Sequence, residues 1–261
     1  MMLKKLLSRS RLSRPKAVQA APASLPEEQR VYAIGDIHGR LDLLEILMHR
    51  IAMDDQQRPP AKTKVIFLGD LVDRGPDSKG VIDYVIKLSK TGVDLRFIAG
   101  NHEEIFLKTI TEPSEKLTRF FYRIGGQETI LSYGIDRAEL AMMTMEELTA
   151  RIPTIVPQSH VRFLTEMEDR IEIGGYLFVH AGIRPEVDIS SQSQHDMRWI
   201  RQEFTESTEC FEKVVIHGHT IFESVSEGPS RIGIDTGAWE TDVLTAIGLD
   251  GGERWFLDTA I

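Results

Sequence analysis

The order of apolar and polar positions predicts alternating strands and helices from residue 31 onward. Short apolar runs at 31–34, 64–68 and 95–98 are typical of buried strands. Between them, apolar residues recur at helical spacing over 40–51 and 81–88. Because alternating strands and helices are joined by right-handed crossovers, we expect these three strands to form a parallel sheet.

The remaining pattern divides into a helical stretch and a β-rich stretch. Residues 103–168 are predicted to be mostly helical, and Gly174-Gly175 between two apolar runs predicts a hairpin. Further strands are expected at 213–216, 231–234, 244–249 and 254–257. The sequence therefore predicts one mixed α/β domain over residues 30–261, with a helical insertion at about 103–168.

Charge is distributed unevenly along the 261 residues. The formal net charge is -9, from 31 basic and 40 acidic residues, yet residues 1–30 hold seven Lys or Arg and only two Glu. We expect residues 1–29 to form a basic, disordered arm, and the acidic remainder argues against a nucleic-acid partner. The chain has no run of eighteen apolar residues, so we expect no stable membrane insertion and a cytoplasmic protein. No feature of the sequence predicts an oligomeric state.

Polar residues of a particular kind follow the predicted strands. The first three strands end in Gly-Asp-Ile-His-Gly at 35–39, Gly-Asp-Leu-Val-Asp-Arg-Gly at 69–75 and Gly-Asn-His-Glu at 100–103. Two later strands end in His-Ala-Gly at 180–182 and His-Gly-His-Thr at 217–220. Open α/β sheets bind ligands at the carboxyl ends of their strands, so these side chains are candidates for one shared site.

The chemistry of these side chains indicates a metal centre. The candidate ligands combine carboxylate, imidazole and amide groups: Asp36, His38, Asp70, Asn101, His180 and His219. Such a mixture suits manganese, iron or zinc better than calcium, which prefers oxygen alone. Six donors suit two ions that share a bridging carboxylate, an arrangement used for phosphoryl displacement.

The motifs GDIHG, GDLVDRG and GNHE, followed by His180 and Gly218-His219, resemble those of the phosphoprotein phosphatase family of calcineurin-like metallophosphoesterases. Gly125-Gly126 and the segment at 234–238 are similar to its bacterial and phage branch. The resemblance implies a β-sandwich flanked by helices, with a dinuclear metal centre at the loop edge of the sheets.

The resemblance also implies a role for each motif residue. Asp36 and His38 would bind one metal, Asp70 would bridge both, and the second would be held by Asn101, His180 and His219. His102 would act as general acid, oriented by Asp73. Phosphate would be bound by Arg74, by Asn101, and by Arg201 in the Trp-x-Arg element at 199–201. The cofactors would be two divalent ions, with Mn²⁺ expected and Fe or Zn also compatible.

The implied activity is hydrolysis of phosphoserine and phosphothreonine, and also of phosphotyrosine in some members, in a phosphoprotein or phosphopeptide. Attack would be in line, by a hydroxide that bridges the metals, without a phosphoenzyme. The alternative is a dinucleoside polyphosphate hydrolase, a branch that usually carries Gly-Asn-His-Asp and lacks the Asp of Asp-Arg-Gly, so Asp73 and Glu103 favour the phosphatase. A non-catalytic binding module would be expected to lack a ligand or the acid, and neither is missing.

Two further interpretations concern residues near or outside the motifs. Glu103 is expected to stabilise the start of a helix, where acidic residues are favoured. His49, His160 and His195 lie outside every motif and are expected at the surface or at helix ends.

Overall fold

The computed structural model describes residues 23–260 and contains two mixed sheets. The first has the strand order β10-β9-β1-β2-β3, and the second has the order β4-β5-β6-β8-β7. The strands of the first are β1 (Gln29–Ile34), β2 (Lys62–Phe67), β3 (Asp94–Phe97), β9 (Thr245–Asp250) and β10 (Glu253–Asp258). Those of the second are β4 (Arg170–Ile173), β5 (Tyr176–Val179), β6 (Val214–His217), β7 (Ser226–Gly228) and β8 (Arg231–Gly233).

Strand pairing confirms the predicted parallel crossovers and adds an antiparallel hairpin to them. β1 pairs with β2 and β2 with β3, both in parallel. The hairpin of β9 and β10 then joins the free edge of β1 in antiparallel orientation. In the second sheet β5, β6 and β8 are parallel, and β4 and β7 close its edges in antiparallel orientation.

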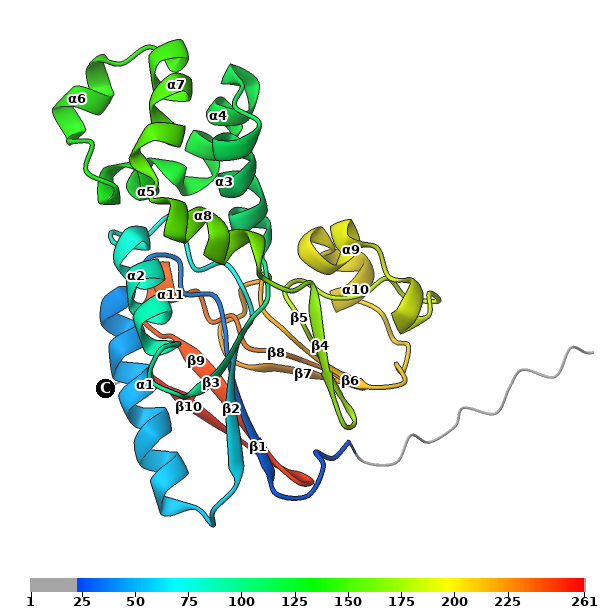
Figure 1. Cartoon of the computed structure of the whole chain (residues 1–261). Coiled ribbons are helices and arrows are strands. Elements are labelled where there is room, and N and C mark those ends of the chain that lie inside the picture. Colours follow the sequence, from blue (N-terminus) through cyan, green and yellow to red (C-terminus); the bar gives the residue numbers. More distant parts are fainter. Residues whose placement is uncertain (1–22, 261) are drawn as a thin grey trace, which may run out of the picture.

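The two sheets pack face to face, and helices cover their outer faces (Figure 1). β1 is buried on both faces: Val31 and Ala33 face the second sheet, whereas Tyr32 and Ile34 face the helices. This alternation follows from the two-residue period of a strand. The mixed α/β fold with helix-flanked sheets that the sequence predicted is therefore confirmed.

The helices fall into three groups. α1 (Leu41–Gln57) and α2 (Ser78–Leu88) cover the first sheet, and α1 buries Leu44, Leu47 and Ile51 at helical spacing. The helical insertion contains α3 (Asn101–Thr111), α4 (Glu115–Phe121), the π-helical turn Tyr122–Gly126, α5 (Gln127–Ser132), α6 (Arg137–Met142), α7 (Met145–Ile155) and α8 (Gln158–Thr165). The second sheet is covered by the 3-10 turn Ile189–Ser191, α9 (Gln194–Trp199) and α10 (Gln202–Thr205), and α11 (Ala238–Thr241) precedes β9.

The predicted boundary of the N-terminal arm requires a correction. The sequence placed residues 23–29 in a disordered arm because they follow an Ala/Pro/Ser-rich stretch, but Gln29 already begins β1. In the structure Leu25 is buried, its backbone N–H donates to the carbonyl of Gly251 at 2.9 Å, and the carbonyl of Ser24 accepts from Gly175 N at 2.9 Å. An apolar side chain and two backbone hydrogen bonds therefore tie this segment to the sandwich. The rest of the predicted arm, residues 1–22, lies outside the described residues.

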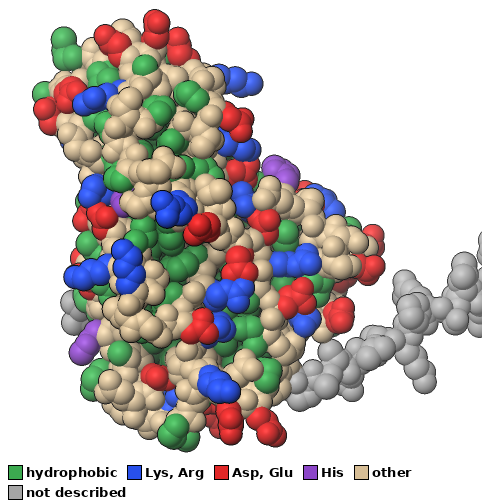
Figure 2. Space-filling model, viewed as in Figure 1, with side chains coloured by type: hydrophobic (Ala, Val, Ile, Leu, Met, Phe, Trp, Pro, Cys, Tyr) green, Lys and Arg blue, Asp and Glu red, His purple; other side chains and the backbone are tan. Residues whose placement is uncertain are grey.

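The surface carries charges of both signs. Figure 2 shows acidic and basic side chains interspersed over the visible face, including the helical insertion. Within residues 23–260, none of the helices combines the length and the apolar character needed to cross a bilayer.

Candidate metal centre and active site

The candidate ligands converge where strands of both sheets end. Asp36 and Asp70 lie in the loops after β1 and β2, and Asn101 begins α3 after β3. The ends of β5 and β6 lead to His180 and His219. All five side chains are buried. The strand-end prediction thus brings residues more than 180 positions apart in the chain to one place.

Backbone strain is concentrated at this point. Eight non-glycine residues of the described chain have positive φ, and five of them belong to the motifs: His38, Asp70, Asp73, Arg74 and His219. Such conformations cost of order 1–3 kcal/mol each and persist where the surroundings enforce them. Their clustering indicates that the loops are shaped for a function rather than for stability.

Glycine permits the close approach of two of these loops. Gly69 has φ +101°, and a β-carbon there would lie 2.6 Å from the backbone nitrogen of Gly100. A side chain at position 69 would therefore push the Asp70 loop away from the loop that carries Asn101 and His102.

Asp70 lies at the centre of three imidazoles. Its Oδ2 is 3.6 Å from His38 Nε2, 3.4 Å from His180 Nε2 and 3.9 Å from His102 Nε2. Two groups could hold a metal ion, and both contain Asp70: one adds His38 and His102, and the other adds His180 and His219. This shared carboxylate has the position that a bridging ligand needs.

The hydrogen bonds of two histidines fit bound cations. His38 Nδ1 is 2.7 Å from the carbonyl oxygen of Val72, and His180 Nδ1 is 2.9 Å from that of Leu68. A carbonyl only accepts, so both rings carry their proton on Nδ1, and a neutral ring directs the lone pair of Nε2 at Asp70. Burial lowers the pKa of His38 well below its usual value, which keeps that ring neutral. A lone pair facing a carboxylate is repulsive unless a cation lies between them.

The second group has the same character. His180 Nε2 lies 3.1 Å from both Asn101 Oδ1 and His219 Nδ1. Three atoms that can bind a metal ion therefore lie close together. Burial lowers the pKa of His219 to about 2, and its Nε2 is buried without a hydrogen-bond partner in the described structure. Imidazole nitrogens, a carboxylate and an amide oxygen form a set of ligands suited to manganese, iron or zinc.

Asp36 lies beside the second group, and outside both groups of metal-binding side chains. Its carboxylate oxygens accept the backbone N–H of His219, at 3.1 and 3.0 Å. Burial and the nearby carboxylates of Asp235 and Asp70 raise the pKa of Asp36 well above its usual value. Three clustered carboxylates in a buried site favour a cation, and the role of Asp36 as a ligand stays a prediction.

The predicted acid and its partner are in direct contact. His102 Nδ1 is 2.6 Å from Asp73 Oδ2, and His102 Nε2 is 3.2 Å from Arg74 Nη2. Burial alone would lower the pKa of His102, but the charges of Asp70 and Asp73 outweigh burial and raise it. These charges favour the protonated ring, whereas Arg74, which only donates, approaches His102 Nε2 as an acceptor.

Thr129 completes this pair, and sequence reasoning missed it. Its hydroxyl donates to Asp73 Oδ1 at 2.6 Å and accepts the backbone N–H of Asp73 at 2.9 Å. Thr129 belongs to α5 of the insertion and lies in no motif, so only the packing of the insertion over the Asp73 loop reveals it.

The two predicted phosphate-binding arginines lie at the rim. Arg74 is half-buried and Arg201 is exposed, with Arg201 Nη1 3.4 Å from the carbonyl oxygen of His219. Neither side chain has a carboxylate partner among the ion pairs of the described residues. Unpaired guanidinium groups beside a metal centre are suited to phosphate oxygens.

Comparison with known proteins connects this geometry to a family. Residues 29–233 match the family described as calcineurin-like phosphoesterase. The asymmetrical bis(5'-nucleosyl)-tetraphosphatase PrpE of Bacillus velezensis is 25% identical over 232 residues, which cover 81% of this chain and 86% of the relative.

Solved structures share the fold. One, provisionally assigned as a diadenosine tetraphosphatase, has a TM-score of 0.63 at 21% identity and covers 91% of this chain and 99% of its own. A protein serine/threonine phosphatase from Saccharomyces cerevisiae has a TM-score of 0.54 at 13% identity and covers 90% of this chain and 80% of its own. With the family match spanning residues 29–233, the chain belongs to the calcineurin-like phosphoesterases and is a metal-dependent phosphoesterase.

Proposed function

We propose that this phosphoesterase hydrolyses phosphoserine and phosphothreonine monoesters in proteins. The observation that carries the proposal is the His102–Asp73 pair, with 2.6 Å between Nδ1 and Oδ2. A seryl or threonyl alkoxide is a poor leaving group, so a positioned general acid is worth about 10²–10⁴-fold in rate. A dinucleoside polyphosphate instead releases a phosphate chain, which is a stable anion at neutral pH and gains little from an acid.

His38, Asp70 and, as predicted, Asp36 would hold one divalent ion, although the Asp36 carboxylate also contacts the backbone of the second group. Asp70, Asn101, His180 and His219 would hold the other. We infer Mn²⁺, with Fe or Zn as alternatives. When bound, the ions supply Lewis-acid polarisation of the phosphoryl group and lower the pKa of water at the site.

The protein's own groups would then bind and protonate the substrate. Arg74, Arg201 and the amide of Asn101 would bind the phosphoryl oxygens, where charge stabilisation dominates catalysis. In its protonated form, in which Arg74 would bind phosphate and no longer donate to Nε2, His102 would give the Nε2 proton to the leaving oxygen. Asp73, fixed by Thr129, would accept from Nδ1 and hold the ring in place.

A second candidate is hydrolysis of dinucleoside tetraphosphates. The tetraphosphatase of Bacillus velezensis aligns over 81% of this chain, which favours it. Against it stand Asp73 and Glu103, because both belong to the pattern typical of the phosphatases.

The two candidates differ in their response to His102→Asn. With Mn²⁺ present, we expect kcat on a phosphoserine peptide to fall by about 10²–10⁴-fold, and kcat on p-nitrophenyl phosphate, which has a good leaving group, to fall much less. Mn²⁺ binding measured by calorimetry should be retained, and His49→Asn on the exposed face of α1 is the matched control. Hydrolysis of diadenosine tetraphosphate with no hydrolysis of any phosphopeptide would replace the first candidate with the second.

A further inference from the structure

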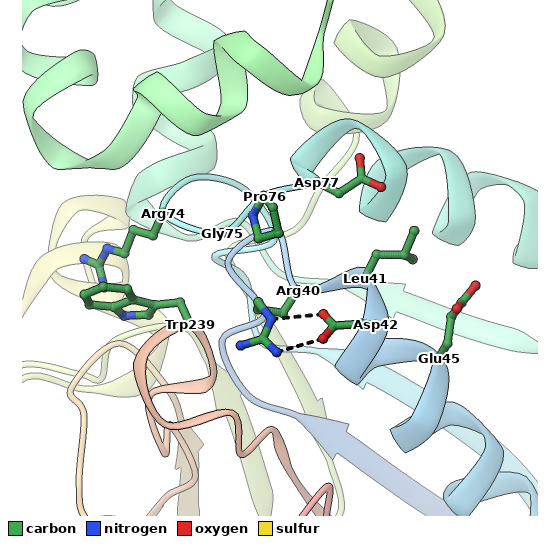
Figure 3. Close-up of a pocket in the computed structure, with 10 residues that line it drawn as sticks. Arg40, Leu41, Asp42, Glu45, Arg74, Gly75, Pro76, Asp77 and Trp239 are labelled. Atoms are coloured by element: carbon green, nitrogen blue, oxygen red, sulfur yellow. Dashed lines mark hydrogen bonds and ion pairs between the residues drawn. The ribbon is translucent and has the colours of Figure 1, made fainter. Parts of the chain in front are cut away.

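A groove of about 590 Å³ opens beside the active site, and Trp239 forms one of its walls (Figure 3). Trp239 is 37% exposed, although most large apolar side chains of the described chain are buried. Ile221, which is 41% exposed, lies close by, with its Cγ2 3.1 Å from the position that a β-carbon would take at Gly237. A second exposed apolar side chain thus lies at Gly237, two residues before Trp239 in the chain.

The fold holds Trp239 in place. It belongs to the short helix α11, which left-handed residues flank at Gly237 (φ 71°) and Asp242 (φ 61°). Arg40 Nη1 donates to the carbonyl of Ala238 at 3.0 Å, and its guanidinium also pairs with Asp42 and Asp242. Two carboxylates neutralise Arg40, so we assign it to positioning α11 rather than to binding phosphate.

Arg74 links the tryptophan to the reacting groups. Its Cζ lies 5.3 Å from the centroid of the Trp239 ring, and its Nη2 lies 3.2 Å from His102 Nε2. Figure 3 shows Arg74 and Trp239 side by side at one end of the groove. Because His102 faces the leaving oxygen in the proposed function, Trp239 lies on the side from which the leaving group departs.

The opposite end of the groove is acidic. Glu45 and Asp77 line the groove, and Figure 3 shows their carboxylates on the side of the view away from Arg74 and Trp239. These carboxylates would repel additional phosphate groups, whereas an indole face beside a cation attracts a planar ring. The groove therefore suits an aromatic part of a substrate better than a polyphosphate chain.

We propose that Trp239, together with Arg74, is a specificity-determining residue that stacks on a planar ring carried by the leaving group of the substrate. The proposal rests on the proposed hydrolysis of phosphate esters at the neighbouring metal centre. It adds ring-bearing substrates to the phosphoserine and phosphothreonine esters, whose leaving groups carry no ring. The ring has two possible sources with the same chemistry, a phosphotyrosyl side chain or a nucleobase.

The test compares esters that differ only in the ring. Trp239→Leu and Trp239→Phe would be assayed with Mn²⁺ on phenyl phosphate against ethyl phosphate, and on diadenosine tetraphosphate against inorganic tetraphosphate. For Trp239→Leu we expect kcat/KM on the ring-bearing member of a pair to fall by about three- to tenfold relative to its ring-free partner. Trp239→Phe should restore most of this difference, and the pair that responds identifies the source of the ring.

Two results would overturn the proposal. One is an equal loss on ring-bearing and ring-free esters, which would make Trp239 a structural residue. The other is no change in either pair. Met142→Leu, at an exposed position in the helical insertion, is the control for apolar surface substitutions.

A binding measurement separates this proposal from the proposed function. Phenylphosphonate, which resists hydrolysis, should quench the fluorescence that Trp239 contributes, and ethylphosphonate should quench it less. The chain has three tryptophans, so Trp239→Phe supplies the signal of the other two. If no ester is hydrolysed, the proposed function fails, yet this difference in quenching still tests the ring site. Equal quenching by the two phosphonates would count against the site.

Discussion

The carboxylate of Glu103, in the first turn of α3, accepts the backbone N–H of Asp70, in the loop after β2, at 2.8 Å. The same carboxylate accepts the N–H groups of Leu71 at 2.7 Å and Gly100 at 2.8 Å. Glu103 is only 1% exposed, so these hydrogen bonds are shielded from water. From the sequence we expected Glu103 to stabilise the start of a helix, which is α3. It does so, and it also fixes the loop that presents the central carboxylate of the metal site.

We expect Glu103→Gln to weaken metal binding and to destabilise the fold. The amide has one acceptor oxygen, and its NH₂ group would face backbone N–H donors. Loss of charge-assisted hydrogen bonds should lower the free energy of unfolding by about 1.5–3 kcal/mol. Because Asp70 would be held less firmly, Mn²⁺ affinity should fall by about 10–100-fold, as for other residues that orient metal ligands. Chemical denaturation and calorimetry measure the two effects.

Glu112→Gln is the matched control, since Glu112 is exposed at the end of the same helix. It should change neither quantity measurably. An unchanged Mn²⁺ affinity in Glu103→Gln would show that the Asp70 loop keeps its position without this carboxylate.

The second prediction concerns Thr129. Thr129→Val keeps the shape of the side chain but removes the hydroxyl that donates to Asp73 Oδ1 at 2.6 Å. The backbone N–H of Asp73 loses one of its two acceptors and keeps Ser78 Oγ at 2.9 Å. We expect the free energy of unfolding to fall by about 1–3 kcal/mol. Hydrolysis of a phosphoserine peptide should slow more than that of p-nitrophenyl phosphate, because only the poor leaving group needs a well-oriented His102.

Thr118→Val provides the comparison for this substitution. Thr118 is also fully buried in the insertion, and its hydroxyl contacts Thr149 instead of the active site. It should affect stability without changing the ratio of the two rates. The same change of ratio in both variants would remove Thr129 from the orientation of Asp73.

How far the sequence predicts the site depends on the distance over which each contact acts. Asp70 and His180 stand directly after predicted strands, so their positions in the site follow from the local sequence pattern and from parallel pairing of the strands. Thr129 and Trp239 come from the insertion and from a short helix near β9, and no local pattern links them to the motifs. Their roles follow only from how distant segments pack.

Three features of the structure were not predicted, because they too depend on contacts between distant segments. β7 is three residues long and polar, so it has no apolar run, and it forms because β8 offers an open edge. The pairing of the β9–β10 hairpin with β1 was also not predicted, because an apolar run predicts a strand but not the strand with which it pairs. His160 was expected at the surface or at a helix end. It lies in the first turn of α8, but it is 1% exposed, so the surface position is wrong.

The third prediction concerns the metal ions themselves. Because Asp70, His180 and His219 come together only in the folded chain, ions that bind there should stabilise it. Addition of Mn²⁺ at about 100 times its Kd should raise the free energy of unfolding by about 2.7 kcal/mol per site. Asp70→Asn should abolish most of this gain in thermal denaturation. An equal gain in the variant would place the binding elsewhere.

The last prediction uses the buried His160, which joins the insertion to α2. Its Nδ1 contacts the hydroxyl of Tyr133 at 2.8 Å, and its Nε2 contacts Asp83 Oδ1 at 3.0 Å. Burial lowers the pKa of His160 below 6.5, and the charge of Asp83 offsets this only in part. Below about pH 6.5 the unfolded chain therefore takes up a proton that the folded chain refuses, so the free energy of unfolding should fall as the pH falls. The contribution of His160 is fully present above pH 6.5 and decreases until the pH reaches the lower pKa of the folded state.

Urea denaturation between pH 7.5 and 5 (about the range in which an imidazole titrates) measures this slope. In His160→Gln the slope should be shallower, whereas His49→Gln, at an exposed position, should keep the wild-type slope. A slope unchanged in His160→Gln would assign the pH dependence to other groups, and would mean that His160 titrates alike in the folded and unfolded chain.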